Sequence, residues 1–283
     1  GEDAPDHLND RRLLAQLHRV SLSRALPCGN GGLCDAPRNP HMKDMKDSVS
    51  GAPTLRAASY NIRKCVGLDW RRRPDRVLDV IAGLKADIVA VQEADKRLGA
   101  RPAALPREGI ARQTDLVPVE VAANGVSLGW HGNALLVRRG IETEQVTRLD
   151  LPGLEPRGAV IADLRREGLP IRVVAAHLGL LRRHRQRQLA AIAERLAGLA
   201  PRPTMIMGDF NEWSEEDGLD PLRPHFTVHA PGRSYHAARR LAPLDRIATC
   251  AAFDLHGAGM DEGPQATRAS DHLPIWADLS VRG

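Results

Sequence analysis

The stretch TMIMGDFN, residues 204–211, joins a short apolar run to two side chains that suit acid, base or metal chemistry. Thr204 to Met207 has the composition and length of a buried β-strand. Asp209 and Asn211 follow that strand, where loops held by a rigid sheet commonly carry functional groups. Because a Gly-Asp pair also forms ordinary turns, the stretch is informative only if its pattern recurs along the chain.

The pattern of an apolar strand with a polar side chain at its end does recur, from residue 55 onward. The further expected strands cover residues 55–60, 88–91, 171–176, 245–249 and 275–279. The polar residues at their ends are Asn61, Glu93, His177, Asp245, Asp271 and His272. Residues 75–84 and 183–199 place apolar side chains at helical spacing, which predicts two amphipathic helices. Strands and helices therefore recur together, which predicts a layered fold of helix and sheet.

The composition is that of a soluble globular protein. Of the 283 residues, 42% are hydrophobic and 27% are charged, which excludes collagen-like, coiled-coil and disordered chains. No apolar run approaches the ~20 residues that a membrane-spanning helix needs. The N-terminus also lacks the apolar stretch of about 7–15 residues that marks a secretory signal. We therefore expect a cytoplasmic protein without a transmembrane segment.

Residues 1–53 differ from the rest of the chain. A helix is expected over residues 9–25, followed by the turn-rich sequence CGNGGLC and a linker-like stretch at 41–53. We predict an N-terminal extension or linker over 1–53 and one domain over 54–283. Four cysteines show no zinc spacing, and we expect free thiols, although Cys28 and Cys34 are close enough for a local disulfide.

The net charge of +5 permits partners that carry phosphate but does not require them. Arginine supplies 35 of the 40 basic residues, and codon bias is the favoured explanation of that excess. The aromatic content of 3% argues against an extended platform for stacking bases.

Six segments taken together resemble the endonuclease/exonuclease/phosphatase superfamily of DNase-like, metal-dependent phosphoesterases. They are SYNI (59–62), VQE (91–93), AHLG (176–179), GDFN (208–211), LDRI (244–247) and SDHLPI (270–275). GDFN and SDHLPI are specific motifs, and all six occur in the order found in the family. The resemblance implies a four-layer αββα sandwich, in which two mixed β-sheets pack face to face and helices lie outside.

The resemblance also implies a chemistry that fits the residue types. A phosphoester carries negative charge that Mg²⁺, held by one or two carboxylates and water, neutralises during attack at phosphorus. Glu93 is the expected ligand for Mg²⁺, or for Mn²⁺, with Asn61 and Asp271 nearby. His272 oriented by Asp245 is the expected base for the attacking water.

The other catalytic residues implied by the family lie on the second set of strand ends. His177 is expected to donate a hydrogen bond to a phosphoryl oxygen. Asp209 and Asn211 flank the attacking water or a second metal, so Asp209 is an alternative to His272 as the base. Asn133 in HGNALL and Arg157 in EPRGAV are candidate phosphate contacts, or else a turn residue and a surface ion pair respectively.

The sequence leaves three functions open: hydrolysis of a phosphoester whose identity is not fixed, and two alternatives. The opening YNIRKCVGLDWRRRPDRVLDVI (60–81) resembles bacterial members that cleave lipids or small phosphodiesters, but Tyr235 and His236 stand where a Phe-Pro pair is typical. A phospholipid head group, a small phosphodiester or a nucleic acid therefore remain as partners, and no obligate protein partner is inferred. The first alternative is a non-specific endonuclease or exonuclease on DNA. The second is a catalytically silent binding module on the same fold.

Overall fold

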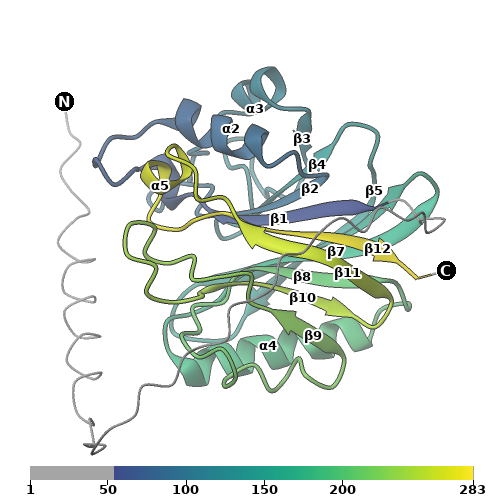
Figure 1. Ribbon diagram of the computed structural model, residues 1–283. Helices are drawn as coiled ribbons and strands as arrows, with labels where there is room; N and C mark the ends of the chain where they lie inside the picture. Colours follow the sequence, from purple (N-terminus) through teal and green to yellow (C-terminus); the bar gives the residue numbers. More distant parts are fainter. Residues whose placement is uncertain (1–53, 283) are drawn as a thin grey trace, which may run out of the picture. The chain divides into compact units, whose positions relative to one another are not determined.

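The computed structural model describes residues 54–282 and consists there of two six-stranded sheets with helices on both outer faces (Figure 1). The predicted extension over 1–53, with its helix over 9–25 and with Cys28 and Cys34, lies outside the described residues. None of the helices within 54–282 is long and apolar enough to cross a membrane.

The first sheet has one parallel pair of strands among antiparallel ones. Its order is β11 (Phe253–Met260), β12 (Ile275–Val281), β1 (Leu55–Asn61), β2 (Ile88–Gln92), β4 (Ala134–Arg138) and β3 (Leu116–Pro118). β1 and β2 run parallel, with Asn61 beside Gln92, and their other neighbours run antiparallel to them. The sheet is therefore mixed, as expected.

The second sheet repeats this arrangement. Its order is β5 (Glu142–Leu151), β6 (Arg157–Arg166), β7 (Leu169–His177), β8 (Thr204–Asp209), β10 (Asp245–Cys250) and β9 (Phe226–His229). β7 and β8 run parallel, while β10 runs antiparallel to β8. The ends of β1, β2, β7 and β8 and the starts of β10 and β12 thus lie at one end of the sandwich, which we call the polar end.

Within residues 54–282, four helices and one 3-10 turn lie outside the sheets. Helices α2 (Pro74–Gly83), α3 (Arg107–Gln113) and α5 (Ala266–Ala269), with the 3-10 turn η1 (Arg63–Cys65), lie on the side of the first sheet, and α4 (Arg182–Ala197) covers the second. Proline at the first position of α2 supplies a helical φ where no N–H partner is needed. α4 buries Leu189 and Ile192 of the predicted stripe.

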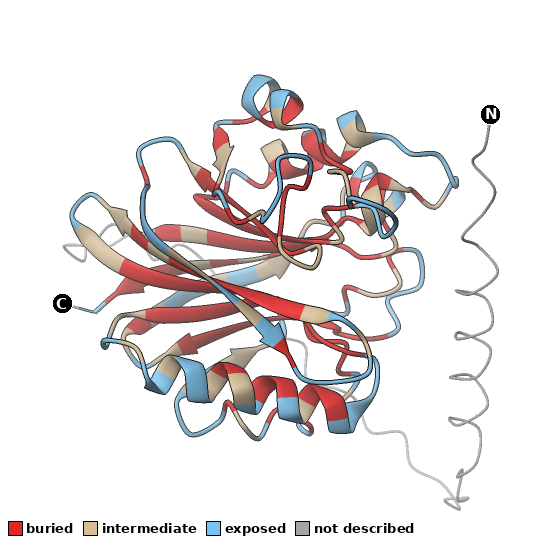
Figure 2. Ribbon diagram, turned by 180° about the vertical axis from the view of Figure 1, so that it is seen from behind, coloured by how far each residue is buried: buried red, intermediate tan, exposed pale blue. Residues whose placement is uncertain are grey.

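Three apolar cores separate the four layers, and Figure 2 shows buried residues running along the strands and one face of α4. One core packs Val77 and Ile81 of α2 on the first sheet, and another packs Leu189 of α4 on the second. The middle core joins the inner faces of both sheets through residues such as Ala57 and Met207. Since alternate strand residues point to opposite faces, each central strand feeds two cores. The expected αββα sandwich is confirmed.

Within residues 54–282, the strands and helices expected from the sequence are present, with ends shifted by up to two residues. Strands β3, β4, β5, β6, β9 and β11 and the short helices α3 and α5 were not expected. β5 is polar and largely exposed, and it lies at the edge of its sheet, so it lacks the apolar run of a buried strand.

Candidate active site

The polar end of the sandwich brings together side chains from both sheets. In the second sheet, Asp209 lies laterally between His177 and Asp245. Side chains two positions apart on a strand point to the same face of the sheet. Met207 and Ile247 face the middle core, and the three polar residues lie an even number of positions from such core residues on their own strands, so they also point between the sheets. The strand pattern alone therefore directs their side chains into one space.

Asn61 reaches the same space from the first sheet. Its Nδ2 donates a hydrogen bond of 2.9 Å to Oδ2 of Asp209, which joins residues 148 positions apart. The backbone oxygen of Asn61 accepts a hydrogen bond of 2.7 Å from Ser270, directly before Asp271. The loop that carries Asp271 and His272 is thereby fixed to the end of β1.

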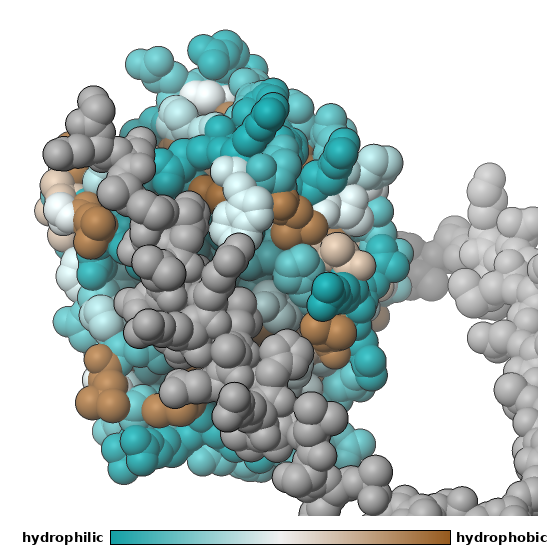
Figure 3. Space-filling view, turned by 90° about the vertical axis from the view of Figure 1, so that its left-hand side faces the viewer, coloured by the Kyte–Doolittle hydropathy of each residue, from teal (hydrophilic) through white to brown (hydrophobic). Residues whose placement is uncertain are grey.

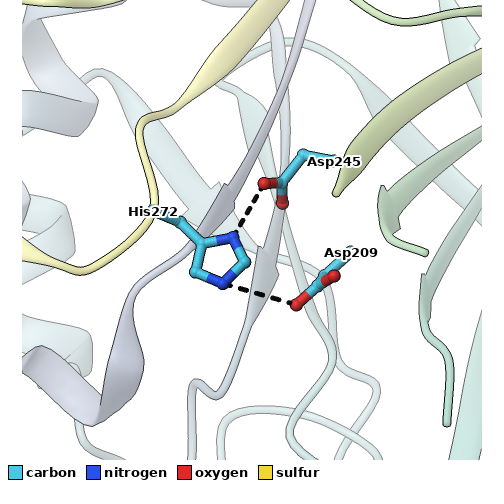
Figure 4. A group of neighbouring side chains, drawn as sticks. All are labelled: Asp209, Asp245 and His272. Carbon is cyan, nitrogen blue, oxygen red and sulfur yellow. Dashed lines mark hydrogen bonds and ion pairs between the residues drawn. The ribbon is translucent and has the colours of Figure 1, made fainter. Parts of the chain in front are cut away.

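His272 lies between two buried carboxylates, as Figure 4 shows. Its Nδ1 donates to Oδ2 of Asp245 at 2.8 Å, and the hydroxyl of Ser234 donates to the same oxygen at 2.5 Å. Its Nε2 faces Oδ2 of Asp209 at 3.7 Å, which is too long for a direct hydrogen bond. The Asp245 contact fixes the ring and leaves Nε2 directed into the site.

The two histidines differ in charge. Burial alone lowers the pKa of His272, but the negative charges of Asp245 and Asp209 outweigh burial and raise it to about 10. Burial lowers the pKa of His177 to about 3, and the positive charge of Arg157 acts in the same direction. His177 Nε2 lies 3.4 Å from Oδ2 of Asp209. The site therefore pairs a cationic imidazole with a neutral one.

Glu93 follows β2 and is held by two cations. Nζ of Lys64 donates to its Oε2 at 2.6 Å, and Arg97 lies 3.7 Å from Oε1. Burial raises the pKa of Glu93, but the charge and hydrogen bond of Lys64, together with other nearby positive charge including Arg97, outweigh burial and lower the pKa to about 2. The charges of Glu93 and of His272 both act on His177. Glu93 and His272 thus belong to one cluster.

The oxygen atoms of this cluster suit a hard divalent cation. Asp271 lies 3.4 Å from Nε of Arg63, so the carboxylates of Glu93 and Asp271 each face a basic side chain. Carboxylate and amide oxygens are the ligands that Mg²⁺ prefers. In this structure Lys64 and Arg63 supply positive charge to these carboxylates, and a bound cation would take over that role.

A second group of possible metal ligands consists of Asp209, Asp245 and His272. Two of its possible ligand atoms, Nδ1 of His272 and Oδ2 of Asp245, already form a hydrogen bond with each other. The group is therefore better suited to holding and orienting a proton than to holding a metal ion.

Asn211 and Asn133 are fixed by backbone contacts. Asn211 has a φ of 52°, which asparagine tolerates better than most residues, and its Nδ2 donates to the oxygen of Leu178 at 2.9 Å. Asn133 is fully buried and donates to the oxygen of Gly158 at 2.9 Å, while its Oδ1 has no hydrogen-bond partner. Within the described residues, the amide oxygen of Asn133 is thus buried and left without a hydrogen-bond partner.

Gly208 of GDFN is required by the strand pairing. It has a φ of 155°, and a Cβ at this position would overlap the carbonyl oxygen of Ala176 on β7. Glycine therefore lets β8 approach β7 closely directly before Asp209.

Arg157 forms an ion pair of 2.7 Å with Glu155 and still lowers the pKa of His177 through its charge. Arg157 therefore has an ion-pair partner and lies near the cluster, while its contact with a phosphate group stays a prediction.

A buried ion-pair network lies under the GDFN loop and was not expected from the sequence. Glu212 is buried, and Arg185 of α4 contacts its Oε2 at 2.7 Å. Arg182 lies 3.3 Å from the same oxygen, and the fully buried Arg246 donates to the backbone oxygens of Glu212 and Ser214. The sequence did contain a sign of this network, because Arg185 lies on the same face of α4 as the buried Leu189 and Ile192.

Comparisons with known proteins agree with this geometry. A model of the Endonuclease/Exonuclease/phosphatase family matches residues 58–272, and the chain belongs to that family. Its sandwich is the phosphoesterase fold of the superfamily.

Individual relatives are more distant. The uncharacterized protein YbhP of Escherichia coli (strain K12) is 33% identical over 168 residues, 54% of this chain and 64% of that protein, so the match spans less than two thirds of the relative. The mannosyl-6-phosphatase Bt3783 of Bacteroides thetaiotaomicron superposes with a TM-score of 0.63 at 15% identity, covering 80% of this chain and 99% of that one. D. rerio TDP2 complexed with a single-strand DNA product has a TM-score of 0.60 at 15% identity, covering 81% and 99%. At these identities the two structures show the fold alone.

Proposed function

We propose that the protein is a Mg²⁺-dependent phosphoester hydrolase in which water attacks phosphorus with help from the His272–Asp245 pair. The observation that carries the proposal is the placement of His272 between Asp245 and Asp209, joined to the first sheet through Asn61. Family membership supports the reaction class.

Glu93, Asp271 and Asn61 would hold the metal through their oxygen atoms. A divalent cation held there supplies positive charge that stabilises the growing charge on the phosphoryl group and lowers the pKa of nearby acids. Such a cation would take over the electrostatic role that Lys64 has at Glu93 in this structure.

Nε2 of His272 would accept the proton of the attacking water. Asp245 fixes the tautomer by holding Nδ1 and stabilises the cation that forms. Because the carboxylates raise the pKa of His272 to about 10, the ring needs added positive charge nearby to act as a base at neutral pH. Asp209 faces the same space and is the alternative base.

The neutral His177 would donate a hydrogen bond to a non-bridging phosphoryl oxygen. Its lowered pKa keeps it uncharged, and a neutral imidazole has one N–H to donate. Asn133, with a buried unpartnered oxygen, and Arg157 are proposed substrate contacts. Asn211 holds the loop that carries Asp209.

We favour a phospholipid-like or small phosphodiester substrate, with non-specific DNA cleavage as the alternative. A panel of plasmid DNA, an abasic oligonucleotide, sphingomyelin, phosphatidylinositol phosphates and bis(p-nitrophenyl) phosphate tests this with wild type and Glu93→Ala. Hydrolysis of a lipid or small diester that needs Glu93 supports the proposal. Cleavage confined to DNA selects the alternative, and no metal-dependent hydrolysis of any substrate selects a silent binding module.

A further inference from the structure

The polar end exposes an unusual number of large apolar side chains. Within residues 54–282, eight of the nine large hydrophobic side chains that are exposed lie on its loops. They are Trp70, Leu98, Val126, Leu154, Leu180, Leu181, Trp213 and Leu241. The ninth, Leu255, lies on the edge strand β11, and the loops at the opposite end within this range expose none.

These side chains come from separate loops around the candidate site. Leu98 follows the strand that ends before Glu93, Leu154 lies between β5 and β6, and Leu241 precedes Asp245. Leu98 and Leu154 are 76% and 81% exposed, nearly as much as in an unfolded chain. Single apolar side chains scattered over the whole surface of a protein are normal. Here they gather on the loops around one site, which points to an interaction surface.

Exposed basic residues adjoin most of these positions. Trp70 is followed by Arg71, Arg72 and Arg73, Leu98 follows Lys96 and Arg97, Leu181 precedes Arg182 and Arg183, and Leu241 follows Arg239 and Arg240. The guanidinium of Arg63 also lies 4.7 Å from the ring centre of Trp70. Figure 3 looks onto this end and shows apolar patches separated by hydrophilic surface.

We call the loops of the polar end that carry these eight apolar side chains the rim. We propose that the rim docks onto a membrane surface that carries anionic phospholipids. The leucines would enter the boundary between head groups and acyl chains, and the adjacent guanidinium groups would meet lipid phosphates. Nucleic acid would use the charges but not the aliphatic side chains, because bases stack on aromatic or guanidinium planes. The inference deepens the proposed function and rests on it for the reaction: the site would face a head-group phosphoester.

One stretch of the rim carries the opposite charge. Glu215, Glu216 and Asp217 are exposed and follow Trp213. Repulsion from anionic lipids would keep this stretch away from the surface, so contact centres on the Leu98, Leu181 and Leu241 loops.

Vesicle sedimentation tests the docking surface without requiring turnover. The full chain is mixed with vesicles of phosphatidylcholine alone, or of phosphatidylcholine with phosphatidylglycerol in a two-to-one ratio, at low and high salt. An apolar variant carries Leu98→Ser, Leu181→Ser and Leu241→Ser, and a charge variant carries Arg71→Gln, Arg183→Gln and Arg239→Gln. Matched controls carry Arg112→Gln, Arg139→Gln and Arg195→Gln, or Leu255→Ser. Thermal unfolding verifies that each variant is folded.

The wild type is expected to sediment with the anionic vesicles and to be released by salt. The charge variant should bind at least about tenfold more weakly, since each basic residue near such a surface contributes about a factor of five to affinity. The apolar variant should also bind at least about tenfold more weakly, and both controls should bind like wild type.

Equal binding to neutral and anionic vesicles, or rim variants that bind like wild type, would overturn the inference. Binding to single-stranded DNA in place of vesicles, lost in the charge variant and kept in the apolar variant, would assign the rim to nucleic acid. Vesicle docking without hydrolysis of any phosphoester would instead overturn the proposed function and leave the docking surface standing.

Discussion

Nδ1 of His272 donates a hydrogen bond to Oδ2 of Asp245 at 2.8 Å, and the Asp245 side chain is fully buried. The two residues lie 27 positions apart and meet because β10 begins, and the loop before β12 passes, at the same end of the sandwich. A ring held on one nitrogen presents the other nitrogen in a fixed direction. Nε2 therefore faces Asp209 without rotating, which is what a general base requires.

Asp245→Asn should lower kcat for bis(p-nitrophenyl) phosphate by about 10²- to 10⁴-fold, because the amide neither fixes the reactive tautomer nor stabilises the imidazolium. Steady-state kinetics at saturating Mg²⁺ measures this loss. Asp254→Asn removes an exposed ion pair with Arg282 and serves as the control. Equal rates for Asp245→Asn and wild type would show that the pair has no part in turnover.

Mg²⁺ should raise the unfolding temperature of wild type, because a cation that binds the folded state stabilises it. Glu93→Gln should abolish that rise by removing a charged ligand. Lys64→Met should enlarge it, since it frees the Glu93 oxygen that Lys64 holds at 2.6 Å. Calorimetry across a Mg²⁺ titration gives the result, with the exposed Glu120→Gln as control. A rise that survives in Glu93→Gln would place the metal elsewhere.

Arg185→Met should cost about 3 kcal/mol of unfolding free energy, because it leaves the Glu212 carboxylate buried without its 2.7 Å partner. Arg187→Met on the exposed face of α4 should change stability by less than about 0.5 kcal/mol. Urea unfolding of both variants makes the comparison. Similar stabilities would mean that Arg182 compensates fully for the loss of Arg185.

Cys65 should resist alkylation in the folded protein, and stability should fall as pH rises. Burial raises the pKa of Cys65 from 9.0 to about 12. The folded state then keeps the thiol protonated between these values while the unfolded chain ionises, so its contribution is complete below 9 and is lost toward 12. Iodoacetamide labelling mapped by peptide mass spectrometry should modify Cys65 only after unfolding. Rapid labelling of native Cys65 would contradict its burial.

Much of the fold follows from local patterns, because apolar runs and helical stripes are set within a few residues. The runs at 88–91 and 204–207 became β2 and β8, and the stripe of Leu189 and Ile192 became the buried face of α4. The polar strand β5 and the short β9 could not be found this way, because pairing to a neighbour rather than their own composition holds them in the sheet.

The prediction of the candidate site depended more on the family resemblance than on the residues alone. The hydrogen bond from Asn61 to Asp209 joins residues 148 positions apart, and only the arrangement of the strands brings these two residues together. The network of Glu212 and Arg185 was missed because a run of charged residues such as 182–187 is ordinarily found on a solvated helix face. The structure corrects this for His184 and Arg185, which are buried, while Arg182, Arg183 and Arg187 are exposed.

The most direct test of the account measures release of p-nitrophenol from bis(p-nitrophenyl) phosphate by chelator-treated protein as Mg²⁺ is restored. Wild type should regain activity with added Mg²⁺, while Glu93→Ala and His272→Ala should each stay at least about 100-fold lower at every concentration. Activity that ignores Mg²⁺, or that Mg²⁺ restores equally in both variants, would contradict a single metal-dependent cluster built from Glu93 and His272.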